Sequence, residues 1–354
     1  MDKRIKVAVI GCGTIGSSQH VPAYMKNKNV EIKYLCDIDR EKAERAAEIA
    51  GCGIVSTNYR DFLNDPELDA VSVCTPNNLH AEISEAFLKA GKDVFCEKPA
   101  SYDYKLALEM QKTQAETGRL LEIGVCNRFD NNVRKLRDII QRGDLGEIYH
   151  VYASFRAHRC IPGLGGAFTT KKIAGGGVMI DWGVHYLDIV MFCCGDPTPK
   201  TVSAETFCKL GKDIKGYTYT DMWAGPPIPD GTYDVEDSMI AMVRTDGPTI
   251  TMHGAWAQNI GENETYIDFI GTKGGARFYY GRSFKIWSTQ DGMLTETDFE
   301  GPVTSKFENA LNAFVEETQN RQKMATNIDV HIISSAIIDA IYRSADEHRE
   351  IIFG

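Results

Sequence analysis

The sequence predicts an α/β protein of two domains. The first, residues 1–125, is expected to hold a doubly wound parallel sheet. The second, residues 126–354, is expected to be an α/β domain with a large open, mostly antiparallel sheet. Three observations predict this. Up to about residue 125, short apolar runs alternate with helical patterns, as in parallel sheets with crossover helices. Between residues 201 and 287, β-like runs follow one another without helices between them. The length of 354 residues also favours two domains over one.

In the first domain, short β-branched and apolar runs predict strands, and helical periodicity fills the gaps between them. Asp39 stands where the N-cap of the second helix belongs, and Gly51, Gly91 and Gly118 stand at helix C-caps. The predicted strands are residues 5–10, 30–37, 70–74, 93–96 and 120–125, and the helices include 41–50, 79–90 and 104–117.

In the second domain, a helix and a strand precede a glycine run that leads into an apolar helix, and a series of strands follows. A Tyr- and Pro-rich excursion, residues 216–233, interrupts that series and is predicted to be a surface loop that carries function or contacts. The predicted elements are helix 132–141, strand 148–156, the glycine run and helix 175–194, strands 201–209, 238–244, 249–256, 265–270, 276–280 and 284–287, and helices 306–321 and 328–347.

Helices that cover one face of an open sheet leave the other face in need of a partner. The sequence therefore predicts a homo-oligomer joined sheet to sheet. A net charge of −10 argues against nucleic acid or an anionic membrane as a partner. No apolar run approaches the roughly 20 residues of a membrane span, and the apolar segment at 7–10 is too short for a signal peptide.

The ten cysteines show no repeated C-x-x-C spacing, and no group of His and Cys has the spacing of metal ligands. We therefore expect no metal site. Several cysteines lie inside predicted strands, where they are interpreted as small buried apolar residues of a reducing, cytoplasmic compartment.

The first predicted strand ends in the turn Gly11-Cys-Gly13-Thr-Ile-Gly16, and Asp37 follows Gly16 by 21 residues. Gly11 permits a tight turn, Gly13 lets the backbone approach a pyrophosphate, and Gly16 lets the following helix lie close to the sheet. The phosphates then meet backbone N–H groups at a helix N-terminus. This pattern predicts a dinucleotide-binding Rossmann domain. Further cofactor contacts are expected inside the turn and beside the acid, from Thr14, Ile15 and Ile38.

Asp37 also indicates which dinucleotide is bound. A carboxylate at the end of the second strand accepts hydrogen bonds from a ribose 2′-OH and repels a 2′-phosphate. Arg40 is placed to serve a phosphate, but Asp37 and Asp39 lie within three residues of it. The sequence therefore favours NAD over NADP.

The fourth and fifth predicted strands end in polar residues, at the sheet edge where α/β proteins bind ligands. After the fourth strand, Thr75, Pro76, Asn78 and His80 are expected beside the cofactor, although Asn77 or Asn78 is equally suited to cap the next helix.

The fifth strand is followed by Glu97-Lys98-Pro99. Glu97 and Lys98 are predicted cofactor contacts. Lys98 is also placed to hydrogen-bond a substrate hydroxyl, the alternative being a solvated lysine at a strand end. A cis peptide bond is an option at Lys98–Pro99.

The glycine run at 175–177 leads to Asp181 and His185, which are four residues apart and therefore share one helical face. An acid beside an imidazole can orient the ring and raise its pKa, which suits a proton acceptor for an alcohol that is being oxidised. The alternative is a salt-bridged helix surface. Asp188 lies three residues beyond His185, and a structural role is the alternative for it.

Three motifs occur in order: G-x-G-x-x-G at 11–16, Glu97-Lys98-Pro99, and Asp181-x-Gly183-x-His185-x-x-Asp188. With them the chain resembles the Gfo/Idh/MocA oxidoreductases over nearly its whole length. The resemblance implies a Rossmann domain, a second domain with an open sheet, and hydride transfer between a nicotinamide and a carbinol carbon of a sugar or cyclitol. It also implies that Lys98 contacts both substrate and nicotinamide, that Asp181 helps bind the reacting hydroxyls, and that His185 accepts the proton.

The substrate is expected between the domains. Arg, Lys and His can donate to sugar hydroxyls and Trp can stack on a sugar ring, although each of these residues singly could be a surface charge or a core aromatic. Residues 161–168 are rich in glycine and are predicted to be a flexible segment able to cover the pocket. The candidates besides Lys98, Asp181 and His185 are Arg128, Arg156, His158, Lys171, Trp182 and Trp256.

Three functions compete. The leading hypothesis is an NAD-dependent dehydrogenase that oxidises a secondary alcohol of a sugar, glycoside or cyclitol, C3 of a pyranose being one plausible position. The second is NAD-assisted glycoside cleavage through transient oxidation at C3, which consumes no net NAD. The third is a non-catalytic sugar or cofactor sensor, which predicts loss of the Lys or the His. Both Lys98 and His185 are present.

Overall fold

The computed structural model describes residues 4–302 and 304–354, which form two compact units. The first unit comprises residues 4–129 together with Thr304–Ile332, and the second comprises residues 130–302 together with Ile333–Gly354. The chain thus returns to the first unit near its C-terminus. A single boundary near residue 126 does not describe that return.

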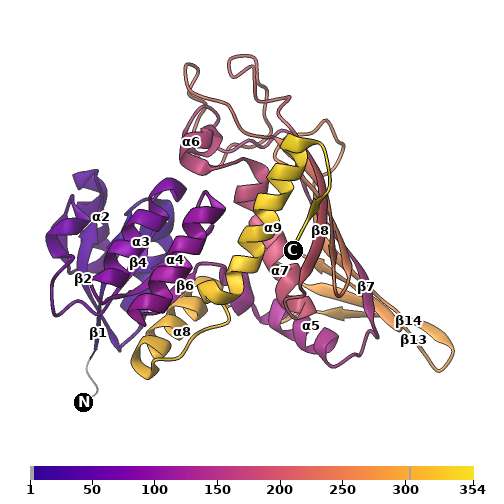
Figure 1. Ribbon diagram of the computed structural model, residues 1–354, viewed down its shortest axis with the longest axis horizontal. Helices are drawn as coiled ribbons and strands as arrows, with labels where there is room; N and C mark the ends of the chain where they lie inside the picture. Colours follow the sequence, from indigo (N-terminus) through magenta and orange to yellow (C-terminus); the bar gives the residue numbers. More distant parts are fainter. Residues whose placement is uncertain (1–3, 303) are drawn as a thin grey trace. The chain divides into compact units, whose positions relative to one another are not determined.

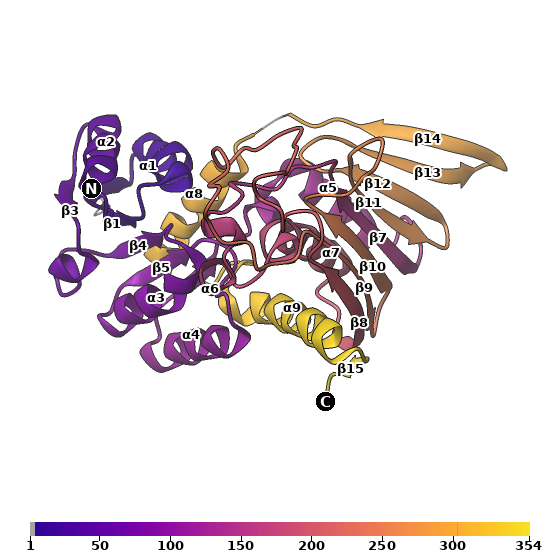
Figure 2. The same ribbon diagram turned by 90° about the horizontal axis from the view of Figure 1, so that it is seen from above.

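The first unit contains a six-stranded parallel sheet with the strand order β3-β2-β1-β4-β5-β6. In Figure 2, α1 and α2 lie on one side of this sheet and α3 and α4 on the other, which is the doubly wound arrangement that the sequence predicts. The strands are β1 (Ile5–Ile10), β2 (Val30–Cys36), β3 (Ile54–Ser56), β4 (Ala70–Val73), β5 (Asp93–Cys96) and β6 (Leu121–Ile123), and the helices are α1 (Val21–Lys26), α2 (Arg40–Ala50), α3 (His80–Lys89), α4 (Tyr104–Thr117) and α8 (Lys306–Asn320).

Local sequence sets the helix ends. Asp39 caps α2 by accepting a hydrogen bond from Glu41 N–H, as predicted, and Asp103 caps α4 in the same way. Both helices end at a glycine in the left-handed region, Gly51 (φ +64°) and Gly118 (φ +63°). β1 lies between β2 and β4, so the strand order reverses there, and in open α/β sheets ligands bind at the carboxyl ends of the strands at that point.

The second unit contains a nine-stranded sheet with the order β14-β13-β12-β11-β7-β10-β9-β8-β15. Only β7 and β10 pair in parallel; the other pairs are antiparallel, which confirms the predicted fold class. β14 and β15 were not among the predicted strands. The strands are β7 (Ile148–Arg156), β8 (Pro199–Phe207), β9 (Ser238–Thr245), β10 (Thr249–Ala255), β11 (Glu264–Gly271), β12 (Gly274–Tyr279), β13 (Phe284–Gln290), β14 (Met293–Phe299) and β15 (Ile351–Ile352).

Helices of the second unit cover one face of its sheet (Figure 1). The central one, α7, packs Tyr186 against Phe155 of β7 with ring centroids 4.8 Å apart. Among the residues that the structure describes, no helix covers the opposite face. The helices are α5 (Asn131–Gln141), α6 (Lys171–Ala174), α7 (Val184–Cys194) and the part of α9 (Ile328–Glu347) after Ile332.

The helical stretch Lys171–Cys194 is long and apolar enough to cross a membrane by length and composition, which the sequence reading did not anticipate. Its most apolar 18-residue window is 83% buried inside the structure. Such burial is typical of a core helix, and the packing of α7 on β7 gives the stretch that role.

Candidate active site

The glycine turn after β1 forms a close backbone cradle. Gly11 has φ +93°, and a Cβ there would lie 2.4 Å from the carbonyl oxygen of Cys74 at the end of β4. A Cβ on Gly16 would lie 2.0 Å from the carbonyl oxygen of Gly11. A Cβ on Gly13, in contrast, would meet no atom within 4 Å. Gly11 and Gly16 are thus required by the fold itself, whereas Gly13 keeps open space beside the backbone.

A helix begins at Thr14 and continues through a π-helical turn, Gly16–His20, into α1. The first-turn N–H groups of a helix have no intrahelical acceptors, so those of Thr14 and Ile15 are suited to an anion. The Asp37 carboxylate fixes the turn: Oδ2 accepts from Cys12 N–H (2.8 Å) and Oδ1 from Asp39 N–H (2.9 Å).

Next to Asp37, Ile38 is 92% exposed. Arg40 donates to Glu44 on the next turn of α2 (2.8 Å), so its guanidinium is paired along its own helix.

The turn after β4 offers an unsatisfied polar group. Thr75 Oγ1 is buried and has no hydrogen-bond partner among the described residues. The N-cap positions of the next two helical segments are Pro76 and Leu79, so the structure does not use Asn77 or Asn78 as the cap residue. Pro76 is exposed and Asn78 is half-buried.

His80 has a different place from the predicted one beside the cofactor. Its ring is buried, with Nδ1 2.8 Å from the carbonyl oxygen of Pro99 and Nε2 2.9 Å from that of Thr75. Burial lowers the pKa of His80, against the two carbonyl groups. With both ring nitrogens engaged inside the protein, His80 links the turns after β4 and β5, which corrects the prediction of a direct cofactor contact.

Lys98 is half-buried between the buried residues Glu97 and Pro99, and the Lys98–Pro99 peptide bond is cis. Two buried side chains fix the position of Glu97. Its Oε1 lies 2.9 Å from Nε2 of His20, and Nδ1 of His20 lies 3.0 Å from the hydroxyl of Ser72. This buried network ties the residue before Lys98 to the helix that follows the glycine turn.

These features together fit a dinucleotide. A backbone cradle is open at Gly13, helix N–H groups adjoin it, and a fixed carboxylate stands at the end of β2. The hydroxyl of Thr75 has no hydrogen-bond partner within residues 4–302 and 304–354. All of them belong to the first unit and lie at the carboxyl ends of its strands.

The second unit supplies Asp181 and His185 on a buried helix. They lie on the π-helical turn Met179–Gly183 and on α7, which continues directly from it. Of the side chains from 178 to 193, all are buried except those of Trp182 and His185, which are half-buried. Nε1 of the fully buried Trp256 donates to Asp181 Oδ2 (3.3 Å). Trp256, predicted as a stacking residue for substrate, instead orients Asp181.

Two predicted substrate residues are placed elsewhere. Arg128 is buried and its Nη1 donates to the carbonyl oxygen of Ala325 (2.9 Å), so it anchors the chain within the first unit. Successive residues of a strand point to opposite faces. Phe155 faces α7, so Arg156 points to the other face, where it pairs with Glu264. Each of the two side chains thus has a structural partner within its own unit.

The other candidates stay predictions. His158 is half-buried, with Nδ1 3.1 Å from the carbonyl oxygen of Gln258, and Lys171 is exposed at the start of α6. The glycine-rich segment 161–168 is packed against the excursion 216–233: Ile228 N–H donates to Leu164 C=O (2.8 Å). The role of this segment as a cover of the substrate pocket stays a prediction.

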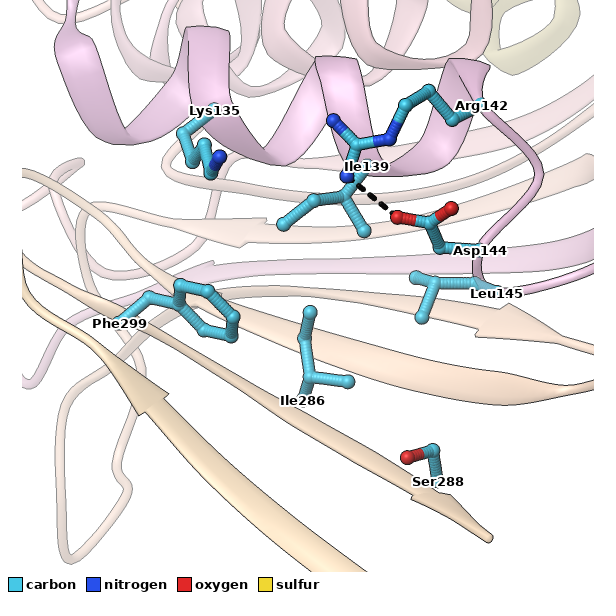
Figure 3. Close-up of a pocket in the computed structure, with 8 residues that line it drawn as sticks. All are labelled: Lys135, Ile139, Arg142, Asp144, Leu145, Ile286, Ser288 and Phe299. Atoms are coloured by element: carbon cyan, nitrogen blue, oxygen red, sulfur yellow. Dashed lines mark hydrogen bonds and ion pairs between the residues drawn. The ribbon is translucent and has the colours of Figure 1, made fainter. Parts of the chain in front are cut away.

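A hollow of about 240 Å³ lies between α5 and the strands β13 and β14 (Figure 3). Arg142 pairs with Asp144 at its rim (2.6 Å). None of its residues is a predicted site residue. They are Lys135, Ile139, Arg142, Asp144, Leu145, Ile286, Ser288 and Phe299.

Comparisons with known proteins identify the family of the chain. Residues 5–125 match the sequence model of the Gfo/Idh/MocA oxidoreductase family with an NAD-binding Rossmann fold, and residues 133–277 match a C-terminal domain of the same family. The chain is 31% identical over 346 residues to a D-glucoside 3-dehydrogenase of Escherichia coli (strain K12), covering 97% of this chain and 95% of that relative. It is 25% identical over 352 residues to an inositol 2-dehydrogenase of Rhizobium meliloti (strain 1021), covering 98% of both.

Solved structures share the fold. An oxidoreductase domain protein from Kribbella flavida superposes with a TM-score of 0.88 at 20% identity, over 99% of this chain and 100% of that one. A levoglucosan dehydrogenase in complex with NADH and levoglucosan superposes with a TM-score of 0.83 at 20% identity, over 99% of both chains.

The fold and the dinucleotide cradle define an NAD(P)-dependent oxidoreductase that acts on CH–OH groups. The chain belongs to the Gfo/Idh/MocA family, whose curated members include dehydrogenases of sugars and cyclitols.

Proposed function

We propose that the protein is an NAD-dependent dehydrogenase that oxidises a secondary alcohol of a sugar, glycoside or cyclitol, with C3 of a glucoside as the first position to test. The Escherichia coli relative, a D-glucoside 3-dehydrogenase that aligns with 97% of this chain, supports the glucoside. The inositol 2-dehydrogenase of Rhizobium meliloti supports a cyclitol as the competing substrate class.

The observation that carries this proposal is the pair Asp181 and His185, one turn apart on a buried helix where only His185 and Trp182 are accessible. Trp256 donates to Oδ2 of Asp181 and so orients the carboxylate, to which we assign the role of hydrogen-bond acceptor for a sugar hydroxyl. His185 then takes the proton of the reacting hydroxyl as general base. From the family resemblance we also assign to Lys98 a hydrogen bond to a substrate hydroxyl, where its positive charge favours the alkoxide that develops. A bound nicotinamide would supply the hydride acceptor for the carbinol carbon.

The preference for NAD over NADP rests on Asp37. Its carboxylate is held in place by two backbone N–H groups, and Arg40 is engaged by Glu44. A fixed negative charge repels a 2′-phosphate, while the remaining lone pairs of the carboxylate can accept hydrogen bonds from a 2′-OH.

We also propose that the protein is a cytoplasmic homo-oligomer joined through the face of the nine-stranded sheet that bears no helix in the described residues. Ile240 and Trp287 are 44% and 39% exposed and lie on strands of this sheet. Sedimentation of the wild type and of Ile240→Lys tests the interface. A shift to monomer in the variant is expected, and a monomeric wild type refutes the proposal.

The central experiment incubates purified protein and NAD with inositols, free hexoses and glycosides, and follows absorbance at 340 nm alongside product analysis. An absorbance rise together with a keto-sugar supports the dehydrogenase and identifies its substrate class. Release of an aglycone without net formation of NADH would favour NAD-assisted glycoside cleavage over the dehydrogenase. No product from any sugar, in a protein that binds NAD, overturns the proposal in favour of a sensor.

A further inference from the structure

We propose that Glu236 and Tyr342 are positioning residues: together they fix the first turn of the helix that carries Asp181 and His185, and so set the geometry of both side chains. The inference rests on the catalytic roles proposed above for Asp181 and His185. It concerns groups of the second unit alone.

Glu236 receives three consecutive N–H groups of the helix start. Its carboxylate accepts from Gly177 N–H through Oε2 (2.8 Å) and from Met179 N–H through Oε1 (3.0 Å), and its backbone carbonyl accepts from Val178 N–H (3.3 Å). First-turn N–H groups have no acceptors within their own helix, so a buried helix start needs such partners. One buried residue of the segment before β9 therefore binds three N–H groups at the helix start.

Tyr342 of α9 completes the arrangement, because its hydroxyl donates to Oε1 of Glu236 (2.8 Å). Burial raises the pKa of Tyr342 well above its usual value, and the neighbouring Glu236 raises it further, so the hydroxyl keeps its proton. Burial also raises the pKa of Glu236, against the hydrogen bonds that it accepts. The helix start is thus connected to β9 and to α9 through one side chain.

The glycine run that precedes the helix is explained by these contacts. A Cβ on Gly177 would lie 2.0 Å from the carbonyl oxygen of Glu236, and a Cβ on Gly176 would lie 2.1 Å from the hydroxyl of Tyr342. Only glycine lets the Glu236 carbonyl oxygen and the Tyr342 hydroxyl lie this close to the backbone. The glycine run at 175–177 therefore supplies the backbone that packs against Glu236 and Tyr342.

The connection to the proposed catalytic pair is short. Gly177 donates its N–H to Glu236, and its carbonyl oxygen accepts from Asp181 N–H (3.0 Å). His185 lies one turn beyond Asp181. A displacement of Gly177 is therefore transmitted directly to Asp181, and errors of about 1 Å in such groups can lower turnover by about 100-fold.

The test uses Glu236→Gln and Tyr342→Phe in the full-length protein. Gln keeps the size of Glu, but its Nε2 cannot accept from Gly177 N–H. We expect Glu236→Gln to lower kcat for the best sugar at least 10-fold and Tyr342→Phe to lower it about 3-fold, with the Kd for NAD unchanged within 2-fold. The double variant should lose no more than Glu236→Gln, because both changes act on one carboxylate.

The matched control is Glu122→Gln. Glu122 is a buried glutamate of the first unit that likewise accepts from a backbone N–H, that of Met324, and from two side chains, Asn327 and Thr326. Glu122→Gln should leave kcat within 2-fold. A loss as large as that of Glu236→Gln would show a general effect of removing a buried carboxylate and would overturn the positioning role.

Two further measurements separate this inference from the proposed function. In an Asp181→Asn background, Glu236→Gln should cause no additional loss of kcat; a multiplied loss would contradict action through Asp181. Amide hydrogen exchange of residues 177–186 should accelerate in Glu236→Gln and not in Glu122→Gln, whatever the activity. If Asp181→Asn and His185→Ala keep full turnover, the proposed function fails, but amide hydrogen exchange still tests the positioning role of Glu236. Unchanged exchange of residues 177–186 in Glu236→Gln would overturn that role.

Discussion

Two glycine-to-alanine substitutions in the turn after β1 can distinguish the residue that the fold requires from the residue that the cofactor requires. Gly11→Ala places a Cβ 2.4 Å from a carbonyl oxygen of the neighbouring strand end, at φ +93°. Gly13→Ala places a Cβ where no protein atom lies within 4 Å. The two variants add the same methyl group two residues apart, so each serves as the control of the other.

The expected magnitudes follow from these distances. A left-handed conformation for alanine costs of order 1–3 kcal/mol. A contact of 2.4 Å with a backbone atom cannot be relieved by a rotamer change, so we expect Gly11→Ala to lower the free energy of unfolding by about 3 kcal/mol or more. Gly13→Ala should change it by less than about 1 kcal/mol, because the new methyl group has open space.

The cofactor should respond in the opposite order. The space beside Gly13 is where the pyrophosphate is expected to approach the backbone. A methyl group there should weaken NAD binding by about 10-fold or more in a protein that is otherwise stable. The assays are urea denaturation followed by circular dichroism and NAD titration by calorimetry. Wild-type NAD affinity in Gly13→Ala, or wild-type stability in Gly11→Ala, would refute this interpretation of the turn.

Three other predictions concern single side chains. Asp37→Ser should weaken NAD more than NADP in parallel titrations, and equal losses for both would remove the ribose assignment. Trp256→Phe removes the donor to Asp181 Oδ2, a bond worth about 1 kcal/mol, so kcat should fall about 5-fold with the Kd for NAD unchanged; unaltered kinetics would contradict the orienting role. Burial raises the pKa of Glu122 to about 8, above its unfolded value near 4.5. Its stabilisation is therefore full below about pH 4.5 and is lost as the pH rises towards 8. Relative to wild type, Glu122→Gln should gain up to about 3 kcal/mol between pH 5 and pH 8 in denaturation experiments, and parallel pH profiles would refute this.

The sequence predicted well those features that are encoded locally. β1, β5, β7 and α4 have the predicted bounds, because each is a continuous pattern bounded by turn residues. β14 (Met293–Phe299) was missed, because its side chains are mostly exposed on both faces and so carry no alternating pattern. The return of Thr304–Ile332 to the first unit has no local signal, because a helical pattern does not state which sheet it packs on.

The candidate site likewise combines features that are encoded locally with features that depend on long-range contacts. The glycine turn and the Asp181–His185 pair follow from spacing along the chain. The partners of Arg128 and Asp181 lie 197 and 75 residues away and have no sequence signal of their own. Arg156 is a case in which a signal was present: strand alternation places it on the face opposite Phe155, and period-2 reasoning applied to the strand would have excluded it.

Long-range contacts of this kind also explain why the family motif alone is an incomplete description of the site. The Asp-x-x-x-His spacing puts two side chains on one face of a helix, but it does not fix where that helix begins. In this chain Glu236, which lies 55 residues after Asp181, binds the N–H groups of the helix start, and Trp256 orients the Asp181 carboxylate. A relative with the motif but without an acceptor at the position of Glu236 should therefore need another partner for its first-turn N–H groups. Substitutions outside the motif can thus alter turnover while leaving every motif residue in place.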